Sequence, residues 1–384
     1  MAEWIECTIG DLCSTISDTY KGNDEKVVLV NTSDVLEGKV LNHTAVLNKN
    51  LKGQFKKTFK KYDILYSEIR PANKRFAFVD FENTSNYIAS TKLMVLRHND
   101  KVLPEFLYAI LKSNYVIEEL QHLAETRSGT FPQITFSSEL SPMKVSLPDK
   151  KTQEQIVSVL SSIEQKMDAN VQINNNLEQQ AQTIYQQMFV DNPSPEWKEG
   201  ILSDIADITM GQSPSGSSYN EESNGTIFFQ GRAEFGFRFP TVRLFTTEPK
   251  RTACANDTLM SVRAPVGDLN VAHTDCCIGR GLAAIHSKTN HQSFVLYTMF
   301  SLKKQLDVFN GEGTVFGSIN RNSLNEMPIL IPSDEKLDEF EGIVAPMDTA
   351  IRNNYDEICR LEQIRDSLLP KLMSGELDVS DIDL

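Results

Sequence analysis

Apolar residues recur along two long segments of the chain with the same spacing. In residues 151–189 they alternate steps of four and three, from Ile156 to Met188. This 3.5-residue period is typical of a coiled-coil seam. Adding 184 to each number gives Phe340 to Leu372 on the same steps. The chain is therefore expected to contain two long helices whose seams can pack on each other.

The middle of each seam is expected to form the contact between the helices. The residues assigned to this contact are Ile156, Leu160, Ile163, Met167, Asn170, Asn174, Leu177, Ile184, Met347, Ile351, Asn354, Ile358 and Leu361. Buried asparagine pairs specify register and orientation at a cost in stability. The alternative is that the three asparagines are partly exposed. At about 1.5 Å per residue, a 33-residue seam from Ile156 to Met188 spans roughly 50 Å.

Prolines mark the ends of these helices and one weak point inside them. Asn192-Pro-Ser-Pro195 should end the first helix, because proline cannot continue it. Pro346 lies inside the second, where a proline costs about 3 kcal/mol. The pattern indicates either a kink there or a short helix followed by a longer one. Pro370 is expected to break the last turn and leave an acidic tail over residues 371–384.

Short alternating segments outside the helices predict strands. In the first part of the chain these are Val27–Val30, Ile64–Ser67, Ala77–Asp80, Leu93–Leu96 and residues 143–148, with one helix over Pro104–Leu120. In the second part they are Thr226–Gln230, Thr258–Val262, Leu282–Ile285 and Ile329–Pro332, with a helix over Phe294–Leu306. Both parts therefore combine short strands with a helix.

The two parts are copies of one unit. The repeated pieces are Trp4 and Trp197, residues 63–67 and 257–261, Leu107-Tyr108 and Leu296-Tyr297, and Gly129-Thr130 and Gly313-Thr314. Their offset drifts from 194 to 184, as expected when loops differ in length on a shared scaffold. Repeats of this length are whole domains.

The predicted fold class follows from this duplication. It is an α+β fold with two repeated α/β domains, separated by two long antiparallel helices that form a coiled coil, with pseudo-two-fold internal symmetry. The boundaries are a first domain at 1–149, a spacer helix at 150–192, a second domain at 193–332, and a second helix with its tail at 333–384.

The negative charge of the chain is concentrated in the two predicted helical segments. The formal net charge of −14 argues against a nucleic-acid partner, but residues 149–192 and 333–384 carry −12 of it. Residues 49–75 hold nine Lys or Arg against two acidic residues. Such an excess could contact a phosphate backbone. The alternative is a solvated, lysine-rich surface loop.

Composition indicates a cytoplasmic protein without a membrane partner. No apolar run approaches the length of a membrane span, and the first ten residues contain Glu3 and Glu6 and no apolar core. Six cysteines lie at spacings that match neither a zinc module nor a disulfide framework, which favours a reducing compartment.

The sequence contains no recognisable catalytic or metal-binding arrangement. A Walker loop is missing. Gly279-Arg-Gly281 precedes a predicted strand, whereas a dinucleotide-binding loop follows one. His273 lies three residues before Cys276-Cys277, yet no second ligand pair follows, so a buried structural cluster is favoured over zinc. The chain is therefore predicted to serve recognition and assembly, not catalysis.

The order of several motifs resembles the specificity subunit of type I restriction–modification systems. These motifs are Trp197 with residues 202–205, Gly211-Gln-Ser-Pro-Ser215, residues 255–259 and 313–319, Ile329–Pro332, and the ending Leu369–Leu377. The first half shows the same order more loosely, and lacks the Gly-x-Ser-Pro loop. The resemblance spans nearly the whole chain.

This resemblance implies a non-catalytic subunit that reads double-stranded DNA. Each domain would read one half of a split site, and the helices would set the spacing and dock two methyltransferase subunits. Restriction subunits would join that core. No cofactor is implied in this chain, because S-adenosylmethionine, ATP and Mg²⁺ would belong to the partner subunits.

The type and position of several side chains predict contacts with DNA, since Arg and Lys suit guanine and phosphate, and Gln and Asn suit adenine. They are Lys56, Lys57, Arg70, Lys74 and Arg75 in the first domain, and Gln212, Ser213, Ser215, Gln230, Arg232, Arg238 and Arg263 in the second. For each the alternative is surface charge or a hydrogen bond that closes a strand. For the whole chain the alternative is a coiled-coil scaffold with two ligand-binding modules that do not bind DNA.

Overall fold

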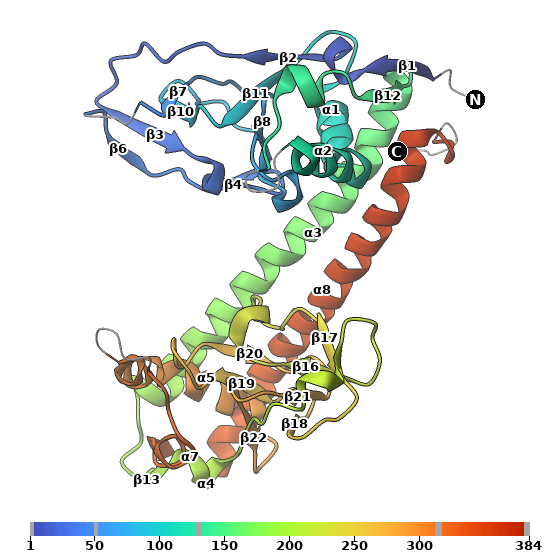
Figure 1. The fold of residues 1–384 in the computed structure, drawn as a ribbon. Coiled ribbons are helices and arrows are strands. Elements are labelled where there is room, and N and C mark those ends of the chain that lie inside the picture. The colour runs from blue at the N-terminus through green and yellow to red at the C-terminus, as the bar shows by residue number, and fades with distance from the viewer. Residues whose placement is uncertain (1–3, 50–52, 128–131, 312–316, 380–384) are drawn as a thin grey trace. The chain divides into compact units, whose positions relative to one another are not determined.

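The computed structural model describes residues 4–49, 53–127, 132–311 and 317–379. The chain forms two compact units, one of Met1–Ala169 with Glu357–Leu384 and the other of Asn170–Asp356. Two long helices, α3 (Lys150–Tyr185) and α8 (Asp334–Ser374), contribute to both units and pack together (Figure 1).

The first unit contains two four-stranded sheets. One has the order β2 (Cys13–Ile16), β11 (Leu93–His98), β8 (Ile64–Ser67), β9 (Phe76–Phe78), and the other β6 (Ala45–Leu47), β3 (Lys26–Val30), β10 (Tyr87–Ser90), β7 (Phe55–Lys57). Smaller antiparallel pairs join β1 (Ile5–Thr8) to β12 (Lys144–Leu147) and β4 (Val35–Leu36) to β5 (Lys39–Val40). The helices α1 (Pro104–Leu111) and α2 (Asn114–Arg127) pack on the first sheet's core with α3 and α8.

The second unit repeats this plan. Its four-stranded sheet has the order β14 (Ala206–Met210), β22 (Leu282–Ser287), β19 (Thr258–Ser261), β20 (Leu269–Val271). Its five-stranded sheet has the order β15 (Tyr219–Asn220), β17 (Leu244–Thr246), β16 (Thr226–Phe229), β21 (Cys276–Ile278), β18 (Thr252–Ala253). The pair β13 (Lys198–Ile201) and β23 (Pro328–Ile331) matches β1 and β12. The described residues of this unit also form the α-helices α4 (Leu202–Ile205), α5 (Gln292–Ser301), α6 (Lys303–Leu306) and α7 (Arg321–Asn325).

Strand pairing confirms the internal duplication. In each unit a mainly antiparallel sheet contains one parallel pair, β3 with β10 in the first and β16 with β21 in the second. The fully antiparallel sheets have the same strand order, since β2, β11, β8 and β9 correspond in turn to β14, β22, β19 and β20. The two domains therefore share one topology although their sequences differ.

Burial along α3 and α8 follows the predicted helical seam. The thirteen residues assigned to it are all buried or half-buried. In the second unit Asn170 and Asn174 are only 1% and 4% exposed. The side chain of Asn354 donates to Oδ1 of Asn174 at 2.8 Å, and in the first unit Lys166 pairs with Glu357 at 3.3 Å. From the first of these contacts to the second, the residue number falls in α3, from 174 to 166, and rises in α8, from 354 to 357. The two helices therefore run antiparallel.

The expectation that Pro370 breaks the last turn was wrong, and one of the two alternatives for Pro346 is excluded. α8 continues without a break through Pro346 and Pro370, so it is not divided at the first or ended at the second, and a kink at Pro346 stays a prediction. Both prolines lie on the exposed side of the helix, while Val344 and Leu372 beside them are fully buried in the hydrophobic cores. Packing of the apolar face supplies most of a helix's stability and here outweighs the proline cost of about 3 kcal/mol.

The single helix expected over Pro104–Leu120 is two helices. The chain breaks at Lys112 and Ser113 between α1 and α2. The Ser113 hydroxyl donates to the Ile110 carbonyl at 2.7 Å and accepts from Val116 N at 3.4 Å, so it closes one helix and opens the next. Similarly, Phe294–Leu306 divides into α5 and α6, and Ala77–Asp80 is shifted to β9.

Candidate nucleic-acid interface

Three arginines surround a small cavity in the second unit. Its volume is about 290 Å³. The residues that line it are Ser213, Gln230, Gly231, Arg232, Ser261, Arg263, Ala264, Arg280 and Gly281. Four of the predicted DNA contacts, Ser213, Gln230, Arg232 and Arg263, therefore lie together around one cavity, although they are spread over fifty residues of sequence.

Close backbone contacts between three loops form the frame of this cavity. Gly281 N donates to Gln230 O at 3.2 Å, and Arg280 N donates to the Ser213 hydroxyl at 3.2 Å. At Gly211 an added Cβ would stand 2.1 Å from the carbonyl oxygen of Gly279, a distance that real side chains do not adopt. Only glycine fits this crossing, which holds the loops that carry the arginines at fixed positions.

The three arginines give the cavity a positive charge, which the nearby carboxylate of Asp268 balances only in part. Arg232 pairs with Asp268 at 2.6 Å, and Asp268 also pairs with Lys303 at 3.3 Å. Arg263 and Arg280 are exposed, and within the described part of the chain their guanidinium groups make no hydrogen bond or ion pair. Like charges gathered in this way attract an anion, and a DNA phosphate or a guanine edge offers the acceptors that Arg needs.

The remaining candidates of the second unit lie elsewhere. Gln212 and Ser215 are exposed on the loop that leads into the cavity, where the Ser215 and Ser217 hydroxyls are 2.8 Å apart. Arg238, expected as a DNA contact, is only 5% exposed and pairs with Glu178 and Asp348 at 3.1 Å each. It is an interior residue, so the expected DNA contact is contradicted, and neither alternative, surface charge or a hydrogen bond that closes a strand, describes it.

In the first unit, two neighbouring lysines have opposite environments. Lys56 is exposed on β7, whereas the ammonium of Lys57 donates to the carbonyls of Thr91 and Leu93 at 3.1 and 2.8 Å. Burial lowers the pKa of Lys57. Lys57 therefore closes a strand edge, which leaves Lys56 as the surface candidate of the pair. Lys52 in the same basic stretch lies outside the described residues.

The other three candidates of the first unit flank the short 3₁₀ turn η3 (Pro71–Asn73). Arg70 is exposed and adopts a left-handed backbone conformation with φ 46°. Lys74 also has positive φ and lies 3.6 Å from Glu37. Arg75 donates to the carbonyls of Ser33 and Val35 at 3.1 and 3.4 Å, so its guanidinium supports a neighbouring turn.

Sequence reasoning missed Arg280, which stands at the rim of the arginine cavity. In the sequence, the motif Gly279-Arg-Gly281 suggests only a dinucleotide-binding loop, and its place before a strand argues against that. The sequence feature that could have identified Arg280 is the glycine on each side of it. Both glycines are needed because the chain at Gly279 and Gly281 approaches the Gln230 backbone too closely for a side chain. The repeated Gly-Thr pairs at 129–130 and 313–314 lie outside the described residues.

The described residues lack two features that are typical of other protein classes. They contain no group of three or more His, Cys, Asp or Glu placed to hold a metal ion. None of the helices in these residues has an apolar stretch long enough to cross a bilayer.

Comparison with known proteins adds independent evidence. The model of the type I restriction modification DNA specificity domain matches residues 1–179 and 195–357. The HindI specificity subunit of Haemophilus influenzae is 31% identical, with 98% of this chain and all of that protein covered. A putative MjaX specificity subunit of Methanocaldococcus jannaschii is 29% identical over 83% of this chain and 79% of its own length. The crystal structure of a type I S subunit from M. genitalium matches 97% of this chain and 96% of its own with a TM-score of 0.59, and at 16% identity it shows likeness of fold.

Proposed function

Because the chain belongs to the family of type I restriction–modification specificity subunits, we propose that it reads an asymmetric DNA site of two separated half-sites. The observation that carries this proposal is the duplicated domain. The two units share one strand order, yet one carries Arg263 and Arg280 around a cavity and the other carries Lys56 and Arg70 on its surface. Two readers with one scaffold and different side chains suit two different half-sites.

The long helices suit the role of a spacer between the readers. Recognition elements on one face of DNA stand about one helical turn apart, roughly 34–36 Å. With 36 and 41 residues, α3 and α8 are roughly 54 and 62 Å long at about 1.5 Å per residue, which is sufficient to separate two such elements. The base pairs between the half-sites would then be unread.

The duplicated surface also suits two copies of one partner. A chain with internal two-fold repetition offers similar helix faces twice, so two methyltransferase subunits can dock in similar ways. The helical segments carry most of the negative charge of the chain, which favours protein partners over DNA there. Restriction subunits would join through these methyltransferases, in the cytoplasm. Methyl transfer with S-adenosylmethionine, and any step that needs ATP and Mg²⁺, would occur in the partner subunits.

The decisive experiment is a map of methylated adenines in host DNA with and without the gene for this chain, in cells that express the methyltransferase subunit. Loss of the mark at one bipartite motif would support the proposal and identify the target. Exchange of residues 1–149 or 193–332 with those of a relative would then change one half-site at a time. An unchanged map would favour the scaffold that does not bind DNA. Binding of the assembled complex to its site should also weaken steeply with salt, by about 0.9 log units per log unit of salt for each phosphate contacted.

A further inference from the structure

Arg238 is the centre of a buried cluster in the second unit. One nitrogen of its guanidinium donates to the Tyr297 hydroxyl at 3.1 Å and lies 3.1 Å from a Glu178 oxygen, while the other donates to Asp348 at 3.1 Å. The Tyr297 hydroxyl donates to Asp348 at 2.9 Å. Two carboxylates, one from each long helix, and one tyrosine from α5 thus surround one arginine.

The backbone identifies the residue that corresponds to Arg238 in the first unit. Val271 in β20 donates from its N–H to Arg238 O at 2.8 Å, and Phe78 in β9 donates from its N–H to Gly38 O at 3.0 Å. These two strands hold equivalent places, because Val271 pairs with Thr258 in β19 and Phe78 with Ile64 in β8. Gly38 therefore occupies the place of Arg238 but has no side chain.

The residues that surround Arg238 have counterparts in the first unit. Tyr108 in α1 matches Tyr297 in α5. The helix offset of 184 carries Glu164 to Asp348 and Glu178 to Glu362, so each unit has one carboxylate from α3 and one from α8. A Cβ at Gly38 would stand 2.3 Å from the Tyr108 hydroxyl, which shows that Gly38 lies against this tyrosine. The tyrosine and the two carboxylates are therefore present in both units, while the arginine at the place of Arg238 is missing from the first.

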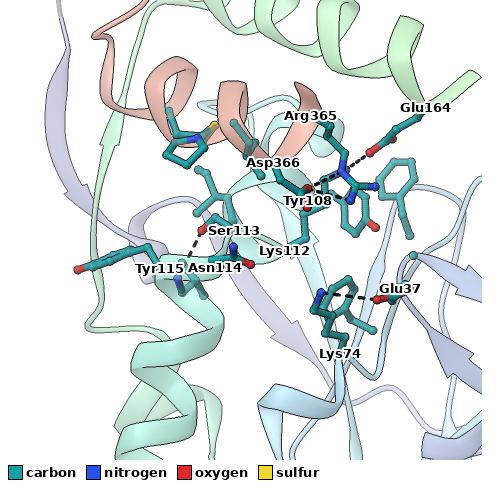
Figure 2. A pocket seen from close by; sticks show the side chains of 18 of the residues that line it. Glu37, Lys74, Tyr108, Lys112, Ser113, Asn114, Tyr115, Glu164, Arg365 and Asp366 are labelled. Atoms are coloured by element: carbon teal, nitrogen blue, oxygen red, sulfur yellow. Dashed lines mark hydrogen bonds and ion pairs between the residues drawn. The ribbon is translucent and has the colours of Figure 1, made fainter. Parts of the chain in front are cut away.

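The place of the missing arginine is a cavity of about 930 Å³. Gly38, Tyr108, Glu164 and Glu362 all line it, and we call it the Gly38 socket. Figure 2 shows Tyr108, Lys112, Glu164, Arg365 and Asp366 gathered in it. The Phe78 ring stacks on Tyr108 with centroids 5.4 Å apart, which offers an aromatic surface of the kind on which a guanidinium packs.

Lys112 replaces part of the missing charge. Its ammonium pairs with Glu164 and lies 4.7 Å from the centre of the Tyr108 ring. Arg365 pairs with Asp366 at 2.8 Å, and the charges of Glu362 and Glu164 also act on it, whereas Glu362 is exposed and makes no hydrogen bond among the described residues. The carboxylates of the wall are Glu37, Asp80, Glu164, Asp168, Glu362 and Asp366, and its cations are Lys39, Lys74, Lys112, Lys144 and Arg365. With six carboxylates and five cationic side chains, the wall has one negative charge more than it has positive charges.

We propose that the Gly38 socket receives an arginine side chain from a docking methyltransferase subunit, in the place that Arg238 fills within the second unit. The identity of the partner rests on the proposed function, whereas the preference for a guanidinium rests on the comparison of the two units. The second unit is closed by its own Arg238, so only one of the two docking faces has an open socket. The two methyltransferase subunits therefore bind unequally.

The first test needs no partner. Thermal unfolding of the full chain is followed with millimolar methylguanidinium, an analogue of the arginine side chain, against sodium at equal ionic strength. We expect a saturable rise in Tm that is lost in the double variant Glu164→Gln, Glu362→Gln and kept in the control Glu154→Gln, an exposed α3 residue outside the socket. The variant Arg238→Gly opens the equivalent space in the second unit and is the positive control. The proposal would be overturned if methylguanidinium raised the Tm of Arg238→Gly but did not raise the Tm of the wild type more than that of the double variant Glu164→Gln, Glu362→Gln.

The second test uses assembly with the methyltransferase subunit. We expect the wild type to bind two copies with different affinities, and Glu362→Lys to weaken one of them at least tenfold while Glu154→Lys does not. Equal affinities for wild type and Glu362→Lys would contradict the proposal. If the wild type bound no methyltransferase at all, the proposed function would fail, but saturable methylguanidinium binding in the first test would still establish the socket as a guanidinium site.

Discussion

Asn354 of α8 donates its side-chain N–H to Oδ1 of Asn174 of α3 at 2.8 Å, inside the apolar seam of the second unit. Asn174 also donates to the Ile351 carbonyl at 3.4 Å. A change of Asn354→Leu leaves the buried Asn174 oxygen without this donor, which should lower the free energy of unfolding by about 1–3 kcal/mol. Denaturant unfolding measures this loss.

The double variant Asn174→Leu, Asn354→Leu should behave in the opposite way. Two leucines in the seam raise thermal stability but no longer specify one register. Light scattering should then detect mixed oligomers. A double variant that stayed monomeric and bound its partners normally would argue against a role of this pair in register.

Removal of the Arg238 side chain should be far more costly than removal of an exposed arginine. Arg238→Ala leaves Glu178 and Asp348 without their buried partner, and breaking a buried ion pair costs about 3–5 kcal/mol. Arg243→Ala is the matched control, since Arg243 lies on the surface of the same unit with its side chain 53% exposed. Urea unfolding should show a large loss for the first and little change for the second.

The neighbouring lysines of β7 should separate DNA binding from stability. Lys56→Ala should leave unfolding unchanged and reduce the salt dependence of DNA binding by about 0.9 in log–log slope, the value for one phosphate contact. Lys57→Ala should instead lower stability by about 1–2 kcal/mol, because its ammonium binds two backbone carbonyls. Anisotropy titrations of the assembled complex at several salt concentrations, with thermal unfolding of each variant, check both. The reverse pattern would show that Lys57, not Lys56, contacts DNA.

A larger residue at Gly231 should obstruct the arginine cavity without disturbing the fold. An added Cβ there meets no atom within 4 Å, and the φ of −163° is open to any residue. Gly231→Leu should therefore weaken specific DNA binding at least about tenfold, or 1.4 kcal/mol, at unchanged Tm. Gly216→Leu is the control, since it also lies in open space but outside the cavity. Equal binding by both variants would remove the cavity from the interface.

The cysteines should differ sharply in reactivity. Burial raises the pKa of Cys13 and of Cys276 to about 12, so almost no thiolate forms at pH 8. Cys254 is exposed, although the charge of Asp257 raises its pKa. Iodoacetamide at pH 8 should label Cys254 well before the two buried thiols, and mass spectrometry of timed samples reads the order. Early labelling of Cys13 would indicate local opening of its sheet.

The spacing of apolar residues predicted the features of the fold that depend on residues close together in the sequence, such as the long helices. The heptad spacing predicted two long helices, and α3 begins at Lys150 as expected. Strand pairing was not predictable in this way, because the parallel pair β3 and β10 joins segments nearly sixty residues apart. Arg238 and Arg263 look alike in sequence, yet one is buried between helices and the other is exposed. Only tertiary structure distinguishes them, since burial depends on which distant carboxylates approach.

The division of the chain has a consequence for its synthesis on the ribosome. The second unit is one continuous segment, Asn170–Asp356, whereas the first needs Glu357–Leu384 as well as Met1–Ala169. Leu369 and Leu372 from that final segment belong to the same core as Ile156 and Leu160. Although domains generally fold in the order of their translation, here the unit that emerges first is completed last. A nascent chain halted before Glu357–Leu384 leaves the ribosome would present one finished domain and one with an unfilled core.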